Sequence, residues 1–418
     1  MIHSLFQLGF SLIGALLPLG ATVFLGWVAW IFWRHYVQQH YLSGMIYVLL
    51  EIKPPREVLR SPKAMELFFT NALYHLSVKG LLEKYWLGAV WYWFSLEIAS
   101  IDGQVHFYIR APSRLKGLIE TQMYAQYPQA EITEVDDYTL AVDKISPTSD
   151  WNLWGCEFKF ARSDVFPIKT YIDFGLDKDP KEEYKVDSLS PVIELFGSIE
   201  KGEQMWVQLV VRANQKKYHT KGTWFKKHDL VTEAEHVISH FSKEFTNVRE
   251  NKTKEIRPAP WHTPVIDAIN KKVAKLTFEC GIRACYVAKK EAFQNNSRRN
   301  LRLIFRQYSS PQLNSFDRFN STQFDYPWQY TEKSLLQLKD RMLEEYRERA
   351  FYHLPLRHGI PIPWPLSIFL PKYFHHHPVV LNTEELATIF HFPGQILKVP
   401  GLERVESKEA SPPTNLPT

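Results

Sequence analysis

The chain has 418 residues, of which 14% are aromatic and 23% are charged, and its formal net charge is +5 at pH 7. This length exceeds that of one ordinary domain, and the aromatic content predicts large packed cores rather than disorder. The net charge is too small to indicate nucleic-acid binding by itself. The three cysteines form no CxxC pair, which argues against a disulfide-stabilised secreted protein.

The N-terminal segment is the most apolar part of the chain. Residues 1–33 contain no Asp, Glu, Lys or Arg, and residues 9–33 are mostly apolar. About 20 such residues are enough to cross a bilayer as a helix. Trp27, Trp30 and Trp33 lie at the far end, as is typical of a headgroup boundary. The sequence therefore predicts a transmembrane anchor over residues 1–34, with the bilayer as a partner of residues 9–33.

The anchor predicts a location as well. A cleaved signal peptide would need a charged start and a small-residue cleavage site, and neither is present. The first basic side chain, Arg34, follows the apolar run directly. By the positive-inside rule, the N-terminus is expected outside a cell membrane crossed once, with the remaining chain in the cytoplasm.

The next segments predict an α+β fold. Residues 35–89 are expected to leave the membrane and to include a helix over 62–78 that begins at Pro62. Strands are expected at 90–98 and 105–110, joined by a hairpin turn at Asp102-Gly103. A helix over 112–127 and a strand over 130–135 complete the pattern of a split βαβ unit.

The pattern then recurs, which suggests two ferredoxin-like units over 90–250 and 262–350. The first unit is expected to contain further strands at 138–142, 157–161 and 205–212, with helices at 191–199 and 232–248. The second is expected to contain helices at 263–275, from 291 and at 335–349, with a strand at 278–288. In both units a strand tyrosine, Tyr108 or Tyr286, is followed by a helix and then by a Gln-Tyr pair.

The last part of the chain is less regular. Residues 351–402 are rich in proline and histidine, and Asn382 with Glu385 is expected to cap a short helix that ends near Phe390. Residues 403–418 are charged and then proline-rich, which predicts a disordered or extended tail.

Common catalytic motifs are missing from the sequence. It contains no GxxxxGK[ST], GxGxxG, HExxH or GxSxG pattern. His236 and His240 have the i, i+4 spacing of two metal ligands, and residues 375–377 are three histidines. No carboxylate or cysteine near His236 and His240 completes a site, so we interpret them as ordinary helix-surface histidines. Residues 375–377 lie in a proline-rich stretch, and we interpret them as a polar loop. We therefore expect no cofactor, no metal and no enzymatic activity, although a hydrolase or transferase with scattered site residues stays open.

One basic segment is a candidate nucleic-acid site. Residues 212–228 carry six Lys or Arg side chains, no acidic residue, and interleaved aromatic rings. Cations that neutralise phosphates and rings that stack on bases are what a single-strand binder needs. The same cluster could meet anionic lipid headgroups, or be a solvated hairpin. The candidate nucleic-acid-binding residues are Arg212, Lys216, Lys217, Lys221, Trp224, Lys226 and Lys227.

Several short stretches carry a family resemblance. They are residues 47–52, 61–66, 106–110 and 126–128, the closing motif Leu381–Pro393 (LNTEELATIFHFP), and the Pro-Pro-Thr-Asn-Leu-Pro stretch at 412–417. Together they resemble an uncharacterised bacterial membrane-anchored domain found ahead of HerA- or TraG-like ATPases, which are related to type IV secretion and conjugative DNA transfer. In fused relatives the ATPase begins shortly after the Asn-Leu-Pro element, whereas this sequence stops there. The resemblance therefore implies that the motor is a separate polypeptide.

Two functional hypotheses follow. The first is a non-catalytic, membrane-anchored scaffold that docks a separate P-loop ATPase, with DNA contact or homo-oligomerisation as compatible additions. Its expected docking residues are Glu384, Glu385, Phe390, Phe392, Pro393, Asn415, Leu416 and Pro417. The alternative is a membrane-tethered nucleic-acid-binding module that uses residues 212–228.

Overall fold

The computed structural model describes residues 2–55, 60–75, 80–177, 187–219, 227–246, 263–324, 327–353, 374 and 376–394, with side chains of helix α1 described from Pro18 onward. The chain divides into two compact units. We call them the N-terminal unit, made of Met1–Ile46, Ser77–Trp91 and His353–Gly359, and the sheet unit, made of Tyr47–Leu76, Tyr92–Tyr352 and Ile360–Thr418.

In the N-terminal unit, helix α1 (Ile2–Ser43) contacts the short helix α3 (Leu81–Tyr85) through aromatic side chains. The Trp33 ring centroid lies 5.4 Å from that of Trp86, and the Trp33 indole N–H donates to the Tyr85 carbonyl at 3.2 Å. Gly88 has φ +70°, and a Cβ there would lie 2.1 Å from the Val37 carbonyl oxygen. Only glycine fits this turn, which lets the chain after α3 approach α1 closely.

The predicted transmembrane anchor is wrong. Over the ranges that the structure describes, none of the helices combines the length and the apolar character needed to cross a bilayer. The predicted helix itself is present in α1. Its described side chains are mostly apolar from Pro18 to Trp33. Arg34, His35, Gln38 and Gln39 then follow before the helix ends at Ser43.

The sheet unit is built on one large antiparallel sheet. Its strands, within the described residues, are β1 (Tyr47–Lys53), β2 (Phe94–Ile101), β3 (Gln104–Pro112), β4 (Glu131–Val135), β5 (Trp151–Phe160), β6 (Glu203–Ala213), β9 (Thr277–Lys289), β10 (Phe316–Phe319) and β11 (Val379–Asn382). They are ordered β10-β5-β9-β6-β2-β3-β1-β4, and β11 pairs with the end of β9. The predicted hairpin turn is confirmed, because Asp102 and Gly103 both have positive φ, at 52° and 83°.

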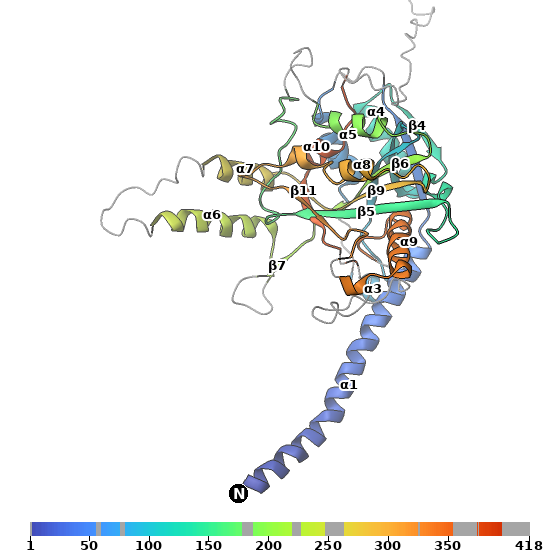
Figure 1. Ribbon diagram of the computed structural model, residues 1–418. Helices are drawn as coiled ribbons and strands as arrows, with labels where there is room; N and C mark the ends of the chain where they lie inside the picture. The colour runs from blue at the N-terminus through green and yellow to red at the C-terminus, as the bar shows by residue number, and fades with distance from the viewer. Residues whose placement is uncertain are drawn as a thin grey trace, which may run out of the picture. The chain divides into compact units, whose positions relative to one another are not determined.

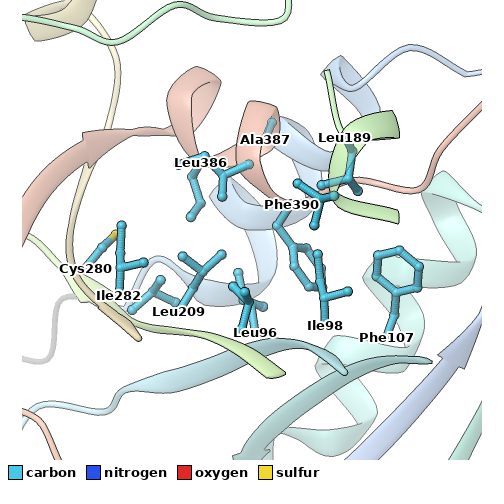
Figure 2. Packing of buried hydrophobic residues seen from close by; sticks show 14 of the residues in the cluster. Leu96, Ile98, Phe107, Leu189, Leu209, Cys280, Ile282, Leu386, Ala387 and Phe390 are labelled. Atoms are coloured by element: carbon cyan, nitrogen blue, oxygen red, sulfur yellow. The ribbon is translucent and has the colours of Figure 1, made fainter. Parts of the chain in front are cut away.

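Helices cover one face of this sheet. They are α2 (Lys63–Phe68), which continues as a π-helical turn over Phe69–Leu73, then α4 (Lys116–Gln126), α5 (Ser190–Gly197), α8 (Asn295–Leu301) and α10 (Thr383–Ile389). Figure 1 shows α4, α5, α8 and α10 together on this side. Leu386, Ala387 and Phe390 from the α10 region lie over apolar side chains of the strands, as Figure 2 shows. This is the main hydrophobic core, and alternate strand residues such as Leu96 and Ile98 supply it.

The opposite face packs against α9 (Glu332–Glu348) and a 3-10 turn over Tyr138–Ala141. Trp206 and Cys285 of the sheet meet Met342 and Tyr346 of α9 in a second cluster. Residues 138–142 were predicted as a strand, and that prediction is wrong. Asp137 instead accepts a hydrogen bond from the Thr139 amide, and this short turn buries Tyr138 against the sheet.

The α+β class is confirmed, but the two ferredoxin-like units are wrong. β9 lies between β5 and β6, so a strand assigned to the second unit occupies the middle of the first. β9 is buried from Phe278 to Ala288. A strand so completely buried belongs to the interior of a sheet with both faces covered. The strands of both predicted units therefore form one continuous sheet.

A smaller cluster lies beside this sheet. It joins α6 (Leu230–Thr246) and α7 (Thr263–Val273), and a two-stranded ribbon of β7 (Tyr218–His219) and β8 (Lys227–His228) precedes α6. Leu230, Ala234 and Ile269 are its buried centre. The helix predicted over 232–248 begins two residues earlier, after Asp229, which accepts a hydrogen bond from the Thr232 amide at 3.0 Å.

Candidate functional site

A row of polar side chains crosses the sheet on the face that α9 covers. The strand register places six residues opposite one another on adjacent strands, and residues opposite each other share a face. We call them the polar row: Glu51, Tyr108, Glu97, Gln208, Arg283 and Glu157. Glu97, Gln208 and Arg283 have no exposed surface.

The C-terminal end of α9 rests on this row. Arg283 donates to the carbonyl of Glu345 at 2.9 Å and to that of Ala350 at 2.7 Å, and Gln208 donates to the carbonyl of Tyr346 at 3.0 Å. Carbonyl groups in the last turn of a helix have no following turn to bond, so they need donors from elsewhere. The polar row supplies these donors and fixes the end of α9 on the sheet.

Arg349, the C-cap residue of α9, forms ion pairs with two carboxylates of this network. It has φ 52° and is fully buried, and its guanidinium bonds both oxygens of Glu97, at 2.8 and 3.0 Å. It also bonds Asp137, while Tyr138 donates to Glu97 at 2.8 Å. Burial opposes the charged form of Glu97, but the guanidinium of Arg349 outweighs it and lowers the pKa of this carboxyl. Glu97 is therefore an ionised acceptor at neutral pH.

A second group of charges lies at the other end of the row. Glu157, Glu345 and His376 each offer a ligand atom, and these atoms all lie within 4.8 Å of one another, which could suit a metal ion. The guanidinium of Arg283 already lies among them, 2.7 Å from Glu157 and 3.3 Å from the His376 Nδ1. Burial raises the pKa of Glu157, yet His376 and Arg283 outweigh it and lower it to about 2. The guanidinium of Arg283 thus occupies the position that a metal ion would take. We interpret this group as a buried charge cluster.

The polar row is best understood as a structural network. Its central side chains are sealed under α9, and their charged groups face partners of opposite charge within the fold. A substrate could reach them only if α9 moved away. A closed network of this kind makes the position of a helix specific rather than supplying a reactive group.

The cysteines do not offer a nucleophile. Cys156, Cys280 and Cys285 are buried and form no disulfide. Burial raises the pKa of the Cys285 thiol to about 12, so it stays protonated at neutral pH.

The structure divides the predicted basic segment into paired and exposed side chains. Arg212 bonds Glu279 at 2.7 Å, and Lys216 bonds Asp164 at 2.6 Å. Lys217 and Lys227 are exposed on or beside the β7–β8 ribbon. Lys221, Trp224 and Lys226 lie outside the described residues.

The closing motif lies in the core of the sheet unit. Its predicted docking residues Glu384, Glu385, Phe390, Phe392 and Pro393 are all buried, so a partner has little access to them. Asn415, Leu416 and Pro417 lie outside the described residues. The predicted cap is confirmed, because Asn382 accepts from the Glu385 amide at 2.8 Å and Glu385 accepts from the Asn382 amide at 2.9 Å.

One buried ion pair ties this motif to α7. The ammonium of Lys272 lies 3.0 Å from the Glu385 carboxylate, and both side chains are fully buried. Glu385 also accepts from the amide of Ile168 at 2.9 Å. This carboxylate therefore joins α7, α10 and the segment after β5.

The structure places the two groups of candidate histidines in different surroundings. His236 and His240 are exposed on α6, and the ring of His236 stacks on His228 at 5.1 Å. Of the three adjacent histidines, His376 belongs to the buried charge cluster, His377 contacts Phe319, and His375 lies outside the described residues.

Sequence reasoning did not find the polar row. Its members lie between residues 51 and 283, and only the strand pairing brings them together. A signal was nevertheless present, because Glu97, Gln208 and Arg283 each lie in the middle of a mostly apolar strand. A charged residue in the middle of a buried strand needs a partner, and this need could have flagged them.

Comparison with known families adds one finding. Residues 45–400 match the family model described as Domain of unknown function (DUF8128). The sequence matches none of the curated proteins with which it was compared. The matched range contains all the strands of the sheet, the polar row and the closing motif. The chain therefore belongs to the family Domain of unknown function (DUF8128).

Proposed function

We propose that this protein is a non-enzymatic docking subunit for a separate HerA- or TraG-like ATPase in a system related to type IV secretion. The observation that carries the proposal is the burial of the closing motif. In the fused proteins that this sequence resembles, the ATPase follows shortly after the Asn-Leu-Pro element. Because this motif is held inside the core, the position of its last residues is fixed. The residues that would lead to such an ATPase begin there.

Three contacts define that starting point. Gly394 donates its amide to Asp187 at 3.0 Å, and His391 bonds the same carboxylate at 3.0 Å. The ring of Phe392 packs edge-on against Tyr127 at 4.9 Å. This proposal retains Asn415, Leu416 and Pro417 as docking residues, because the other residues of the predicted set are buried in the core.

Co-purification tests the proposal. The full chain would be expressed with a HerA- or TraG-like ATPase encoded in the same genome, beside the triple variant Asn415→Ala, Leu416→Ala and Pro417→Ala. We expect the ATPase to be retained by the parent chain and lost with the triple variant. The matched control is Ser411→Ala with Thr414→Ala, which changes the same tail and should retain the ATPase. Failure of the parent chain to retain any such ATPase contradicts the proposal.

The β7–β8 ribbon supports a second candidate function, nucleic-acid binding. Lys217 and Lys227 are exposed there, whereas Arg212 and Lys216 are held by acidic partners at its base. Exposed lysines release counterions when they meet phosphates, which makes binding depend on salt.

Fluorescence anisotropy with labelled single-stranded and duplex DNA tests this function. Replacing Lys217 and Lys227 by Ala should weaken binding, and it should reduce the slope of log K against log salt by about 1.4–1.8, at about 0.7–0.9 per phosphate contact. The control replaces Lys201 and Lys289, which are also exposed. Equal effects of the two double variants would mean that the ribbon has no special role.

A further inference from the structure

A cleft of about 740 Å³ opens at one end of the sheet unit. Its walls come from the start of β5, from Phe293 and α8, from the first half of α9, and from residues 322–324, 327 and 330. Among the described residues that line it, Arg298 and Lys339 carry positive charge and none is acidic. The cleft is therefore cationic.

Two buried N–H donors at this cleft have no acceptor within the described part of the chain. They are the Nε of Arg298 and the indole Nε1 of Trp154. The Trp154 side chain is only 2% exposed. Buried polar groups in folded proteins are nearly always hydrogen-bonded, so two such donors at one cavity point to a missing acceptor.

The two cations are close enough to influence each other. The ammonium of Lys339 donates to the Asn152 side chain at 2.7 Å. Burial lowers the pKa of Lys339, and the positive charge of Arg298 lowers it further. Bringing like charges together costs free energy, and an anion between them would remove that cost.

Part of the wall is aromatic. Phe293, Phe324 and Tyr330 line the cleft, and the rings of Phe324 and Tyr330 meet edge to face with centroids 6.0 Å apart. Tyr330 is 60% exposed, so its ring has free surface beside the opening. Aromatic side chains of this kind accept flat ring systems by stacking.

We propose that this cleft binds a small organic phosphate, with the phosphate between Arg298 and Lys339 and a flat ring against the aromatic wall. A phosphate monoester carries close to two negative charges at neutral pH, which matches two cations better than a single carboxylate does. The Trp154 indole supplies a further donor. This inference is independent of the docking role, because none of these residues belongs to the closing motif or to the tail.

Isothermal titration of the full chain with adenosine monophosphate, adenosine and inorganic phosphate tests the site. We expect the monophosphate to bind more tightly than either fragment, since only it can use both the cations and the rings. Arg298→Met and Lys339→Met should each weaken its binding at least tenfold. Arg299→Met, an exposed arginine on the same helix, should leave binding unchanged. Unfolding curves of each variant distinguish lost binding from lost folding.

Three results would overturn the inference. The first is the absence of binding by all three probes at millimolar concentration. The second is adenosine that binds as tightly as its monophosphate, since the cations would then have no role. The third is unchanged affinity in a folded Arg298→Met variant.

Discussion

Removing the ammonium of Lys272 is the sharpest test of the buried closing motif. The change Lys272→Met keeps a side chain of similar length and leaves the Glu385 carboxylate without its cation. At the observed 3.0 Å separation, Coulomb's law with an effective dielectric of about 20 gives about 5.5 kcal/mol for the pair. Loss of one partner of a buried pair costs about 3–5 kcal/mol in measured cases. We therefore expect a loss of unfolding free energy in that range at pH 7.5.

The size of this loss should depend on pH. Burial raises the pKa of Glu385, and Lys272 offsets this only in part. Without Lys272 the pKa rises further. A carboxyl whose pKa is higher in the folded state stabilises the fold when it is protonated, and it loses that stabilisation as pH rises through the folded pKa. The difference between Lys272→Met and the parent chain should therefore be largest at pH 8 and smaller at pH 5.

Urea unfolding followed by tryptophan fluorescence measures the effect. The matched control is Lys271→Met, because Lys271 is the exposed neighbour on α7 and its replacement should change stability by less than about 0.5 kcal/mol. Combining Lys272→Met with Glu385→Gln removes the uncompensated charge and should recover part of the loss, since the glutamine oxygen can still accept from one of the amides of Ile168 and Asn382. A Lys272→Met chain as stable as the control, or one that Glu385→Gln does not rescue, would refute the reasoning.

Three further predictions concern the face of the sheet under α9. Glu157→Gln should lower the melting temperature at pH 7. The difference from the parent should shrink as pH falls from about 4.5 towards 2, because the stabilisation that comes from the low pKa of Glu157 is lost over this pH range. Arg349→Met should cost about 3–5 kcal/mol in urea unfolding, since it leaves Glu97 buried without a cation. Gly281→Ala should cost about 1–3 kcal/mol in the same assay, because the new Cβ would lie 2.4 Å from the ring of Phe351.

The features that the sequence predicted correctly are local ones. The Asp102-Gly103 turn and the Asn382–Glu385 cap each depend on residues within a few positions of one another. Most strands and helices were likewise placed near their observed positions from alternation and helical spacing. Such signals do not depend on what the rest of the chain does.

The errors concern how distant segments meet. Nothing within residues 277–289 shows that β9 separates β5 from β6, because that order is set by the pairing of whole strands. The apolar N-terminal run predicted a helix correctly, but helical character alone does not decide between a bilayer and other surroundings. The closing motif showed a similar ambiguity. Glu384 and Glu385 read as a charged docking surface, yet each carboxylate has a lysine partner on or just after α7.

These lysine contacts connect the stability of the fold to its proposed function. Glu385 binds Lys272, while Glu384 and Glu66 both bind Lys275 at 2.7 and 3.0 Å. α10 is thus fastened to α2 and to the end of α7 at once. α10 lies before the residues that lead to the proposed docking residues Asn415, Leu416 and Pro417. A variant that loosens these pairs should therefore release α10 before the sheet itself unfolds. Lys272→Met is therefore expected to weaken retention of the ATPase at urea concentrations where the tryptophan signal is still native. Loss of the ATPase only together with global unfolding would mean that the anchoring of α10 does not govern docking.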